Sequence, residues 1–148
     1  MKRFQSKVSV LHDLRKSREE QALRSYAEVV LIRQRSVINL ETVTAARSSL
    51  YTEIQRAISV GCSATLLSQF LSYRDGLETE WTTASEVLRR ASEVVETSLV
   101  KVMDARRERE LIEKFQSKER SIYDQEALLD EQKRLDELAL RRMPLGWG

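Results

Sequence analysis

The sequence predicts an all-α fold, in which two long helices form an antiparallel coiled-coil hairpin and the second helix is longer than the first. Three features of the 148 residues indicate this fold. The only proline is Pro144, and a proline inside a helix costs roughly 3 kcal/mol, so nothing before that position must break a helix. A lone Gly61 stands where the apolar pattern of the first half of the chain stops, and a strict seven-residue repeat then runs from Leu67 to Ile112.

We expect the first helix to span residues 4–59. Its apolar residues recur every three or four positions, as they do on the buried face of a helix, and they form two adjacent stripes. The first stripe comprises Val8, Leu11, Ala22, Val29, Ile32, Val43, Ala46 and Leu50. The second comprises Leu23, Tyr26, Val30, Val37, Leu40, Tyr51, Ile54 and Ile58. Polar residues interrupt the first stripe at Arg15, Arg18, Ser25, Ser36 and Asn39. This seam should therefore be weaker than that of a dedicated zipper.

The predicted turn covers residues 60–63. Gly61 stands where the repeat of the first helix stops, and glycine is the preferred residue for the left-handed position just past a helix end. Ser63 can cap the next helix, because its hydroxyl can accept a hydrogen bond from an amide two or three residues on. So short a connection forces the second helix to run back antiparallel to the first.

The second helix is predicted over residues 64–143, with a short tail at 144–148. Its repeat follows alternating steps of three and four residues through Leu67, Phe70, Arg74, Leu77, Trp81, Ala84, Leu88, Ala91, Val95, Ser98, Val102, Ala105, Arg109 and Ile112. Eleven of these fourteen positions are apolar, as in a left-handed coiled coil. After Ile112 the phase of the apolar repeat slips, and it continues less regularly through Phe115, Ile122, Leu129, Leu135, Leu138 and Leu140.

The two helices are unequal in length, so one end of the second should lack a partner. Counted back from the turn, the first helix ends opposite about Lys118, which leaves residues 119–142 as a projecting helix. Acid-before-base pairs, Asp130 with Arg134 and Glu137 with Arg141, are expected on its surface. Its uncovered leucines predict that this extension binds a partner. We expect the whole chain, residues 1–148, to form a single coiled-coil domain.

The residue patterns typical of active sites are missing, so we predict from the sequence that the protein is not an enzyme. His12 is the only histidine and Cys62 the only cysteine, and no glycine-rich phosphate loop or two-histidine helix motif occurs. We therefore predict no catalytic residue, no cofactor and no metal site. His12 is interpreted as a partly exposed polar residue, and Cys62 as a small residue of the turn.

Nucleic acid and membrane insertion are also disfavoured. Residues 1–62 carry eleven Lys or Arg against six acids, but this charge is spread over a long helix and no groove-reading motif accompanies it. The longest apolar run, Val29 to Ile32, has four residues, far too few to span a membrane. The basic N-terminus leads into a polar segment and does not resemble a secretory signal, so we expect a cytoplasmic protein.

Two parts of the chain carry a distinctive residue pattern. Near the N-terminus the pattern comprises Met1-Lys-Arg-Phe4-Gln-Ser-Lys-Val8, Leu11, Leu14-Arg15, Arg18, Glu19-Glu20 and Ala22. Near the C-terminus it comprises Glu113-Lys114-Phe115, Lys118-Glu119-Arg120, Tyr123 and the run Glu131-Gln-Lys133-Arg134-Leu135-Asp136-Glu137-Leu138-Ala139-Leu-Arg141-Arg142. In both parts the chain resembles the FliJ family, the small coiled-coil proteins of the bacterial flagellar type III export apparatus. Length, central turn and longer second helix also agree, so the resemblance covers nearly the whole chain.

The resemblance implies a stalk with two kinds of contact. In this family the free end of the coiled coil enters the pore of the hexameric export ATPase and promotes its assembly, while the region toward the turn contacts the membrane export gate. Export chaperones are further partners, and the protein works at the inner-membrane face of the export apparatus. The candidate ATPase-binding residues are Arg3, Arg15, Arg18, Arg134, Asp136, Glu137, Arg141 and Arg142. The candidate gate-binding residues are Tyr51, Phe70, Tyr73 and Leu77, although packing of the hairpin would equally explain Phe70 and Leu77.

Two alternatives remain open at the level of the sequence. The stalk protein of a virulence type III secretion system would share the fold and the role. A structural coiled coil that dimerises through its uncovered tail would need no ATPase at all. The size of the particle in solution separates the second alternative from the stalk, because a stalk is an elongated monomer.

Overall fold

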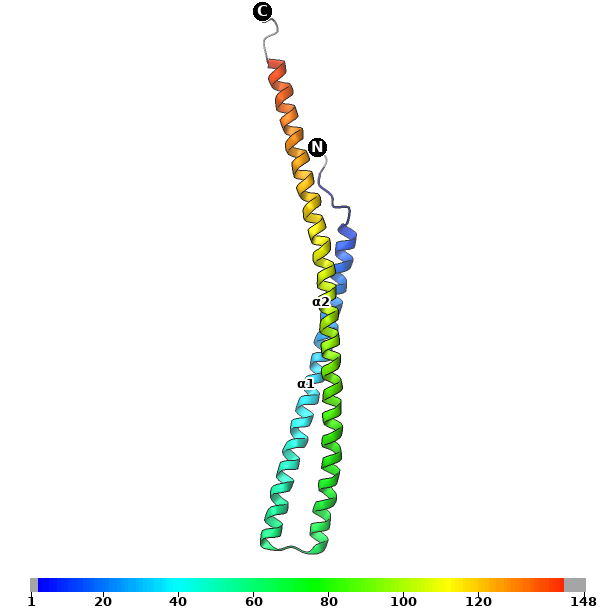
Figure 1. Ribbon diagram of the computed structural model, residues 1–148, viewed down its shortest axis with the longest axis vertical. Coiled ribbons are helices and arrows are strands. Elements are labelled where there is room, and N and C mark those ends of the chain that lie inside the picture. The colour runs from blue at the N-terminus through cyan, green and yellow to red at the C-terminus, as the bar shows by residue number, and fades with distance from the viewer. Residues whose placement is uncertain (1–2, 143–148) are drawn as a thin grey trace, which may run out of the picture. The chain divides into compact units, whose positions relative to one another are not determined.

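The computed structural model describes residues 3–142, which form two helices joined by a short turn (Figure 1). Helix α1 spans Ser9–Val60 and helix α2 spans Ala64–Arg142. The two helices pack against each other, and α2 is longer by 27 residues, the difference between 79 and 52. The all-α hairpin with a longer second helix is confirmed. The expected last residue of the second helix, Met143, and the tail at 144–148 lie outside the described residues.

The turn is built by Gly61 and Ser63. Gly61 has a φ of 92°, in the left-handed region that only glycine adopts without strain, and its amide donates to the carbonyl of Ala57 at 2.9 Å. The Ser63 hydroxyl accepts from the amide of Leu66 at 3.1 Å. One residue therefore ends α1, and another caps the start of α2, as the sequence predicts.

Helix α1 begins at Ser9, five residues later than the predicted start at Phe4. Residues 3–8, which we call the N-terminal strap, instead contact α2. The Lys7 amide donates to the Glu119 carboxylate at 3.2 Å, and the amide of Val8 donates to the Ser6 hydroxyl at 3.3 Å. Side chains of α2 and of the strap thus take up amides that an earlier helix start would have used, which explains the shorter α1.

By their internal packing the residues group into two units, which we describe separately. The first unit comprises Met1–Glu20 and Asp104–Gly148, of which the structure describes 3–20 and 104–142. The second unit comprises Gln21–Met103 and contains the turn. Each unit holds one stretch of each helix. The organisation of the chain as one domain stays a prediction.

The core of the second unit lies near the turn. Leu50, Ile54 and Leu77 form its buried cluster, and Ala46 and Phe70 pack against it. All fourteen positions of the predicted α2 repeat, which extends into the first unit, are buried or half-buried, and none is exposed. The repeat therefore marks the face of α2 that meets its partner, as expected for a seven-residue period.

On α1 the buried line takes residues alternately from the two predicted stripes. Ala22, Val29, Val43 and Leu50 come from the first stripe, while Tyr26, Leu40 and Ile54 come from the second. Five other large residues of the two stripes, Leu23, Val30, Ile32, Tyr51 and Ile58, are exposed, while Val8, Leu11 and Val37 are half-buried. One partner helix covers only a narrow strip, so part of the broad apolar face stays in solvent. Between residues 3 and 142, neither helix contains a stretch apolar enough to cross a bilayer.

Candidate interaction surfaces

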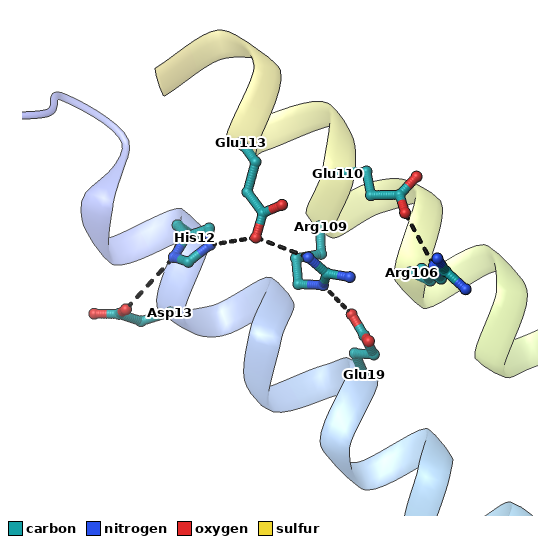
Figure 2. A network of polar contacts seen from close by, with 7 residues as sticks. All are labelled: His12, Asp13, Glu19, Arg106, Arg109, Glu110 and Glu113. Carbon is teal, nitrogen blue, oxygen red and sulfur yellow. Dashed lines mark hydrogen bonds and ion pairs between the residues drawn. The ribbon is translucent and has the colours of Figure 1, made fainter. Parts of the chain in front are cut away.

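A polar network replaces the apolar seam in the first unit (Figure 2). Arg109 occupies a seam position of α2 and bridges Glu19 on α1 and Glu113 on its own helix, the latter at 2.8 Å. His12 Nε2 lies 3.1 Å from the same Glu113 carboxylate, and Arg106 pairs with Glu110 along α2 at 2.9 Å. A cation in the seam is thus satisfied from both helices, which accounts for Arg109 at an otherwise apolar position.

The network shifts the pKa values of two of its members, Arg109 and Glu113. The hydrogen bond to Glu19, reinforced by that to Glu113, raises the pKa of Arg109 above its ordinary value. The Arg109 guanidinium, and secondarily His12, lower the pKa of the Glu113 carboxyl. Both directions favour the charged forms, so Arg109 and Glu113 are both charged at neutral pH.

The N-terminal strap is held on α2 by an aromatic cluster. The rings of Phe4 and Tyr123 meet edge to face with centroids 5.3 Å apart, and the Arg120 guanidinium lies 4.8 Å from the Phe4 centroid. Gln116 donates to the Ser6 hydroxyl at 3.4 Å. Phe4 lines two open grooves of the first unit, of about 810 and 650 Å³. The strap therefore shapes the surface of α2 over residues 116–123.

The structure spreads the candidate ATPase-binding residues of the first unit over the strap, α1 and the end of α2 instead of gathering them in one patch. Arg3 lines the smaller groove beside Ile122, and Arg15 is ion-paired with Glu108. Arg18 is exposed and makes no ion pair with a described residue. The other five lie on the exposed end of α2: Arg134, Asp136, Glu137, Arg141 and Arg142. From Glu108 to Arg142 the helix rises about 51 Å, so no single contact joins all eight.

Of the two ion pairs predicted for this end, one is present. Arg134 lies 3.8 Å from Asp130, one helical turn before it. Among the described residues, Glu137 and Arg141 do not form the second pair. Surface pairs of this kind contribute only a few tenths of a kcal/mol, so the charges near Arg141 are available to a partner.

The candidate gate-binding residues of the second unit divide into two classes. Leu77 is only 4% exposed and belongs to the core, and Phe70 packs against that core. Tyr73 is 59% exposed and Tyr51 is 42% exposed. The Tyr51 hydroxyl donates to the Glu78 carboxylate at 2.9 Å, which orients its ring. Only the two tyrosines therefore offer a large part of their surface to a partner.

A cluster that the sequence reasoning missed surrounds Trp81. Its indole N–H donates to the Thr44 hydroxyl at 3.2 Å, and the Arg47 guanidinium lies 4.9 Å from its ring centroid. Arg47 also pairs with Glu78 at 2.9 Å. Residues equally far from the turn meet in a hairpin, and this simple count would have matched Arg47 with Glu78.

Arg74, the other charged seam residue, is only half-buried and reaches Asp75 at 3.3 Å.

Comparison with known proteins decides the family. A family model described as "Flagellar FliJ protein" matches residues 4–144, nearly the whole chain. The chain belongs to the FliJ family. No curated protein and no solved structure matches it.

Membership of the FliJ family has two consequences for this chain. The protein is a component associated with the flagellar type III export apparatus, and its family is a non-catalytic one. Within residues 3–142, no three His, Cys, Asp or Glu side chains gather so that they could hold a metal ion.

Proposed function

We propose that this FliJ-family protein is the stalk of the flagellar export apparatus, which binds the hexameric export ATPase and the membrane export gate. In this role it promotes assembly of the ATPase ring and protein export. It works in the cytoplasm at the inner-membrane face of the apparatus, where export chaperones are further partners. The proposal joins family membership to the distribution of exposed side chains in the two units.

The exposed end of α2 is the observation that carries the ATPase contact. From Glu131 to Arg142 every residue of the helix is exposed, including Leu135, Leu138 and Leu140 at 60%, 48% and 68%. Apolar residues gathered on an exposed surface favour a partner. We infer that this end is covered when the ATPase is bound.

The stalk would act on the ATPase through binding alone. A protein without catalytic groups can accelerate an enzyme only if it binds one state of that enzyme better than another, and such differences are typically about 1–3 kcal/mol. The contacts proposed for this purpose are the leucines above with the charged residues Arg134, Asp136, Glu137, Arg141 and Arg142. Arg3 and Arg18 extend the contact toward the strap, while Arg15 is engaged by Glu108.

The gate contact is assigned to Tyr51 and Tyr73 on the second unit. Aromatic side chains that are half in solvent are typical anchors of protein interfaces. Leu77 and Phe70 would act indirectly, because they hold the helices that present the two tyrosines. Tyr51→Ala combined with Tyr73→Ala is expected to weaken binding to the gate protein while leaving ATPase stimulation unchanged.

The test of the ATPase contact measures ATP hydrolysis by the purified flagellar export ATPase with and without this chain. Leu135→Ser combined with Leu138→Ser is expected to reduce stimulation at least about tenfold, because each leucine would lose its burial in the interface. Leu31→Ser, at an exposed leucine of the second unit, is the matched control. Full stimulation by the double variant contradicts the proposal.

The same variants address the structural alternative. Sedimentation of the chain alone should give a monomer at all concentrations tested. A stable dimer that dissociates in the variant with Leu135→Ser and Leu138→Ser would instead support a dimerisation protein that needs no ATPase.

A further inference from the structure

Beyond Ile112, two lines of residues diverge on α2. The half-buried positions continue the repeat through Gln116, Glu119 and Tyr123, which face the N-terminal strap and are not aliphatic. The apolar residues leave this line. Leu111, Phe115, Ile122 and Leu129 follow each other at steps of four, seven and seven residues and are 68%, 49%, 55% and 58% exposed. We call these four residues the outer stripe.

The outer stripe has the pattern of a second coiled-coil seam. The seven-residue steps from Phe115 to Ile122 and on to Leu129 keep these side chains on one face of α2 over several turns, as in a face that packs against another helix. Leu111, one helical turn before Phe115, lies on the same face. Residues that merely fill the surface of a solvated helix would not keep this period. The slip in the apolar phase, which looks like a decaying repeat in the sequence, thus creates a separate apolar face in the first unit.

A groove lies along the outer stripe. Its volume is about 650 Å³, and it is lined by Phe115 and Ile122 on α2 and by Arg3, Phe4 and Lys7 of the strap. One wall is therefore the apolar face of α2, and the other is the strap with its basic side chains. Two acids also line the groove: Glu119 accepts the Lys7 amide, and Glu126 forms no ion pair with a described residue.

Two cations that are unpaired among the described residues, Arg3 and Lys7, line the groove, and two more, Lys114 and Lys118, lie on α2 outside that lining. Five arginines of α2 in this unit are ion-paired with described acids: Arg106, Arg107, Arg109, Arg120 and Arg134. Lys114 and Lys118 form no ion pair with any described residue, and the same holds for the side chains of Arg3 and Lys7. Lys118 comes between Phe115 and Ile122 at a core position of the stripe's repeat, where a partner's carboxylate would pair with it.

We propose that this groove binds an amphipathic helix of another protein, with its apolar face on Phe115 and Ile122 and its acidic residues against Lys118 and Lys114. The seven-residue period calls for a helical partner, and the unpaired lysines call for an acidic one. A second copy fits less well. A second copy packed in the parallel orientation would place Lys118 against the Lys118 of that copy. In the antiparallel orientation it would place Lys118 against Ile122 or Gln125. This contact shares Arg3 with the ATPase contact proposed above but includes no residue of Glu131–Arg142.

Two synthetic helical peptides of about three heptads test the proposal with the full-length chain. Both carry leucine at the core positions; one has glutamates at the flanks and at one central core position, and the other has lysines there. Calorimetric titration at low salt should show binding of the acidic peptide and at least about fivefold weaker binding of the basic one, because like charges repel. Lys118→Glu should reverse this preference.

Variants of the groove supply the apolar half of the test. Ile122→Ser should weaken the acidic peptide at least about tenfold, since it removes a side chain buried on binding. Leu31→Ser and Lys101→Glu, at exposed positions of the second unit, are the matched controls and should leave binding unchanged. Circular dichroism checks that each variant keeps its helicity, so a loss of binding is not a loss of fold.

Three outcomes would overturn the proposal. In the first, neither peptide binds at concentrations up to about 1 mM, a limit weaker than most specific contacts. In the second, both peptides bind equally and Lys118→Glu changes neither affinity, which would mean that the face binds apolar helices without regard to their charge. In the third, the chain itself forms a dimer in sedimentation that Ile122→Ser abolishes, which would assign the groove to a second copy.

Discussion

The guanidinium of Arg109 on α2 donates to the carboxylate of Glu19 on α1, and these two residues are 90 positions apart in the sequence. The pair lies inside the seam that joins the helices of the first unit, where apolar residues would be expected. Because Arg109 also bonds Glu113, its removal would leave two carboxylates close together without their cation.

Arg109→Gln is therefore expected to destabilise the chain, and more so than Arg106→Gln. Arg106 makes one exposed pair with Glu110 on its own helix and crosses to no other element. Urea unfolding followed by circular dichroism gives the midpoint of each variant. A lower midpoint for Arg109→Gln alone is the expected result, and equal midpoints for both variants would contradict a structural role for the cross-helix network.

Acid should weaken the network through Glu113. Its pKa is lowered in the folded state, chiefly by Arg109 and then by His12, so its contribution to stability is present above the ordinary carboxyl pKa and is lost as the pH falls through the lower folded value. The difference in unfolding midpoint between the unmodified chain and Glu113→Gln should be largest above the ordinary carboxyl pKa and shrink as the pH falls below it. A difference that grows in acid would refute the assignment.

Burial separates the roles of Leu77 and Tyr73, two residues that the sequence places in one candidate site. Leu77→Ala should lower the free energy of unfolding by about 2–5 kcal/mol, because Leu77 is buried in the core cluster. Tyr73→Ala, at a largely exposed position, should change it by less than about 0.5 kcal/mol. Chemical denaturation measures both, and comparable losses would mean that Tyr73 also packs in the core.

The two described glycines should respond to alanine with opposite signs. Gly61→Ala forces a side chain into the left-handed region and should destabilise the turn by about 1–2 kcal/mol, since no neighbouring atom within 4 Å would clash and only the backbone is strained. Gly76→Ala, in the interior of α2 with equally free space, should stabilise by up to about 1 kcal/mol. Thermal unfolding of the two variants provides the comparison.

The sequence predicts the fold more completely than it predicts the candidate surfaces. The repeat from Leu67 to Ile112 predicts which face of α2 is covered, because one strict period specifies one face. The two stripes of α1 do not specify a face, since either could meet a single partner helix. Past Ile112, apolar residues alone mislead, because the strap covers a more polar line that contains Gln116 and Glu119.

The sequence by itself determined the helical class, the position of the turn, the antiparallel direction and the family. These properties depend on local preferences, such as the φ of Gly61 and the cap of Ser63, or on a period that one helix carries alone. Only the tertiary structure decided that Phe4 folds back onto Tyr123, that Arg109 is neutralised inside the seam, and that Phe115 and Ile122 remain outside it. Each of these outcomes depends on how side chains about 90 or more positions apart meet across the hairpin, and no local pattern encodes that meeting.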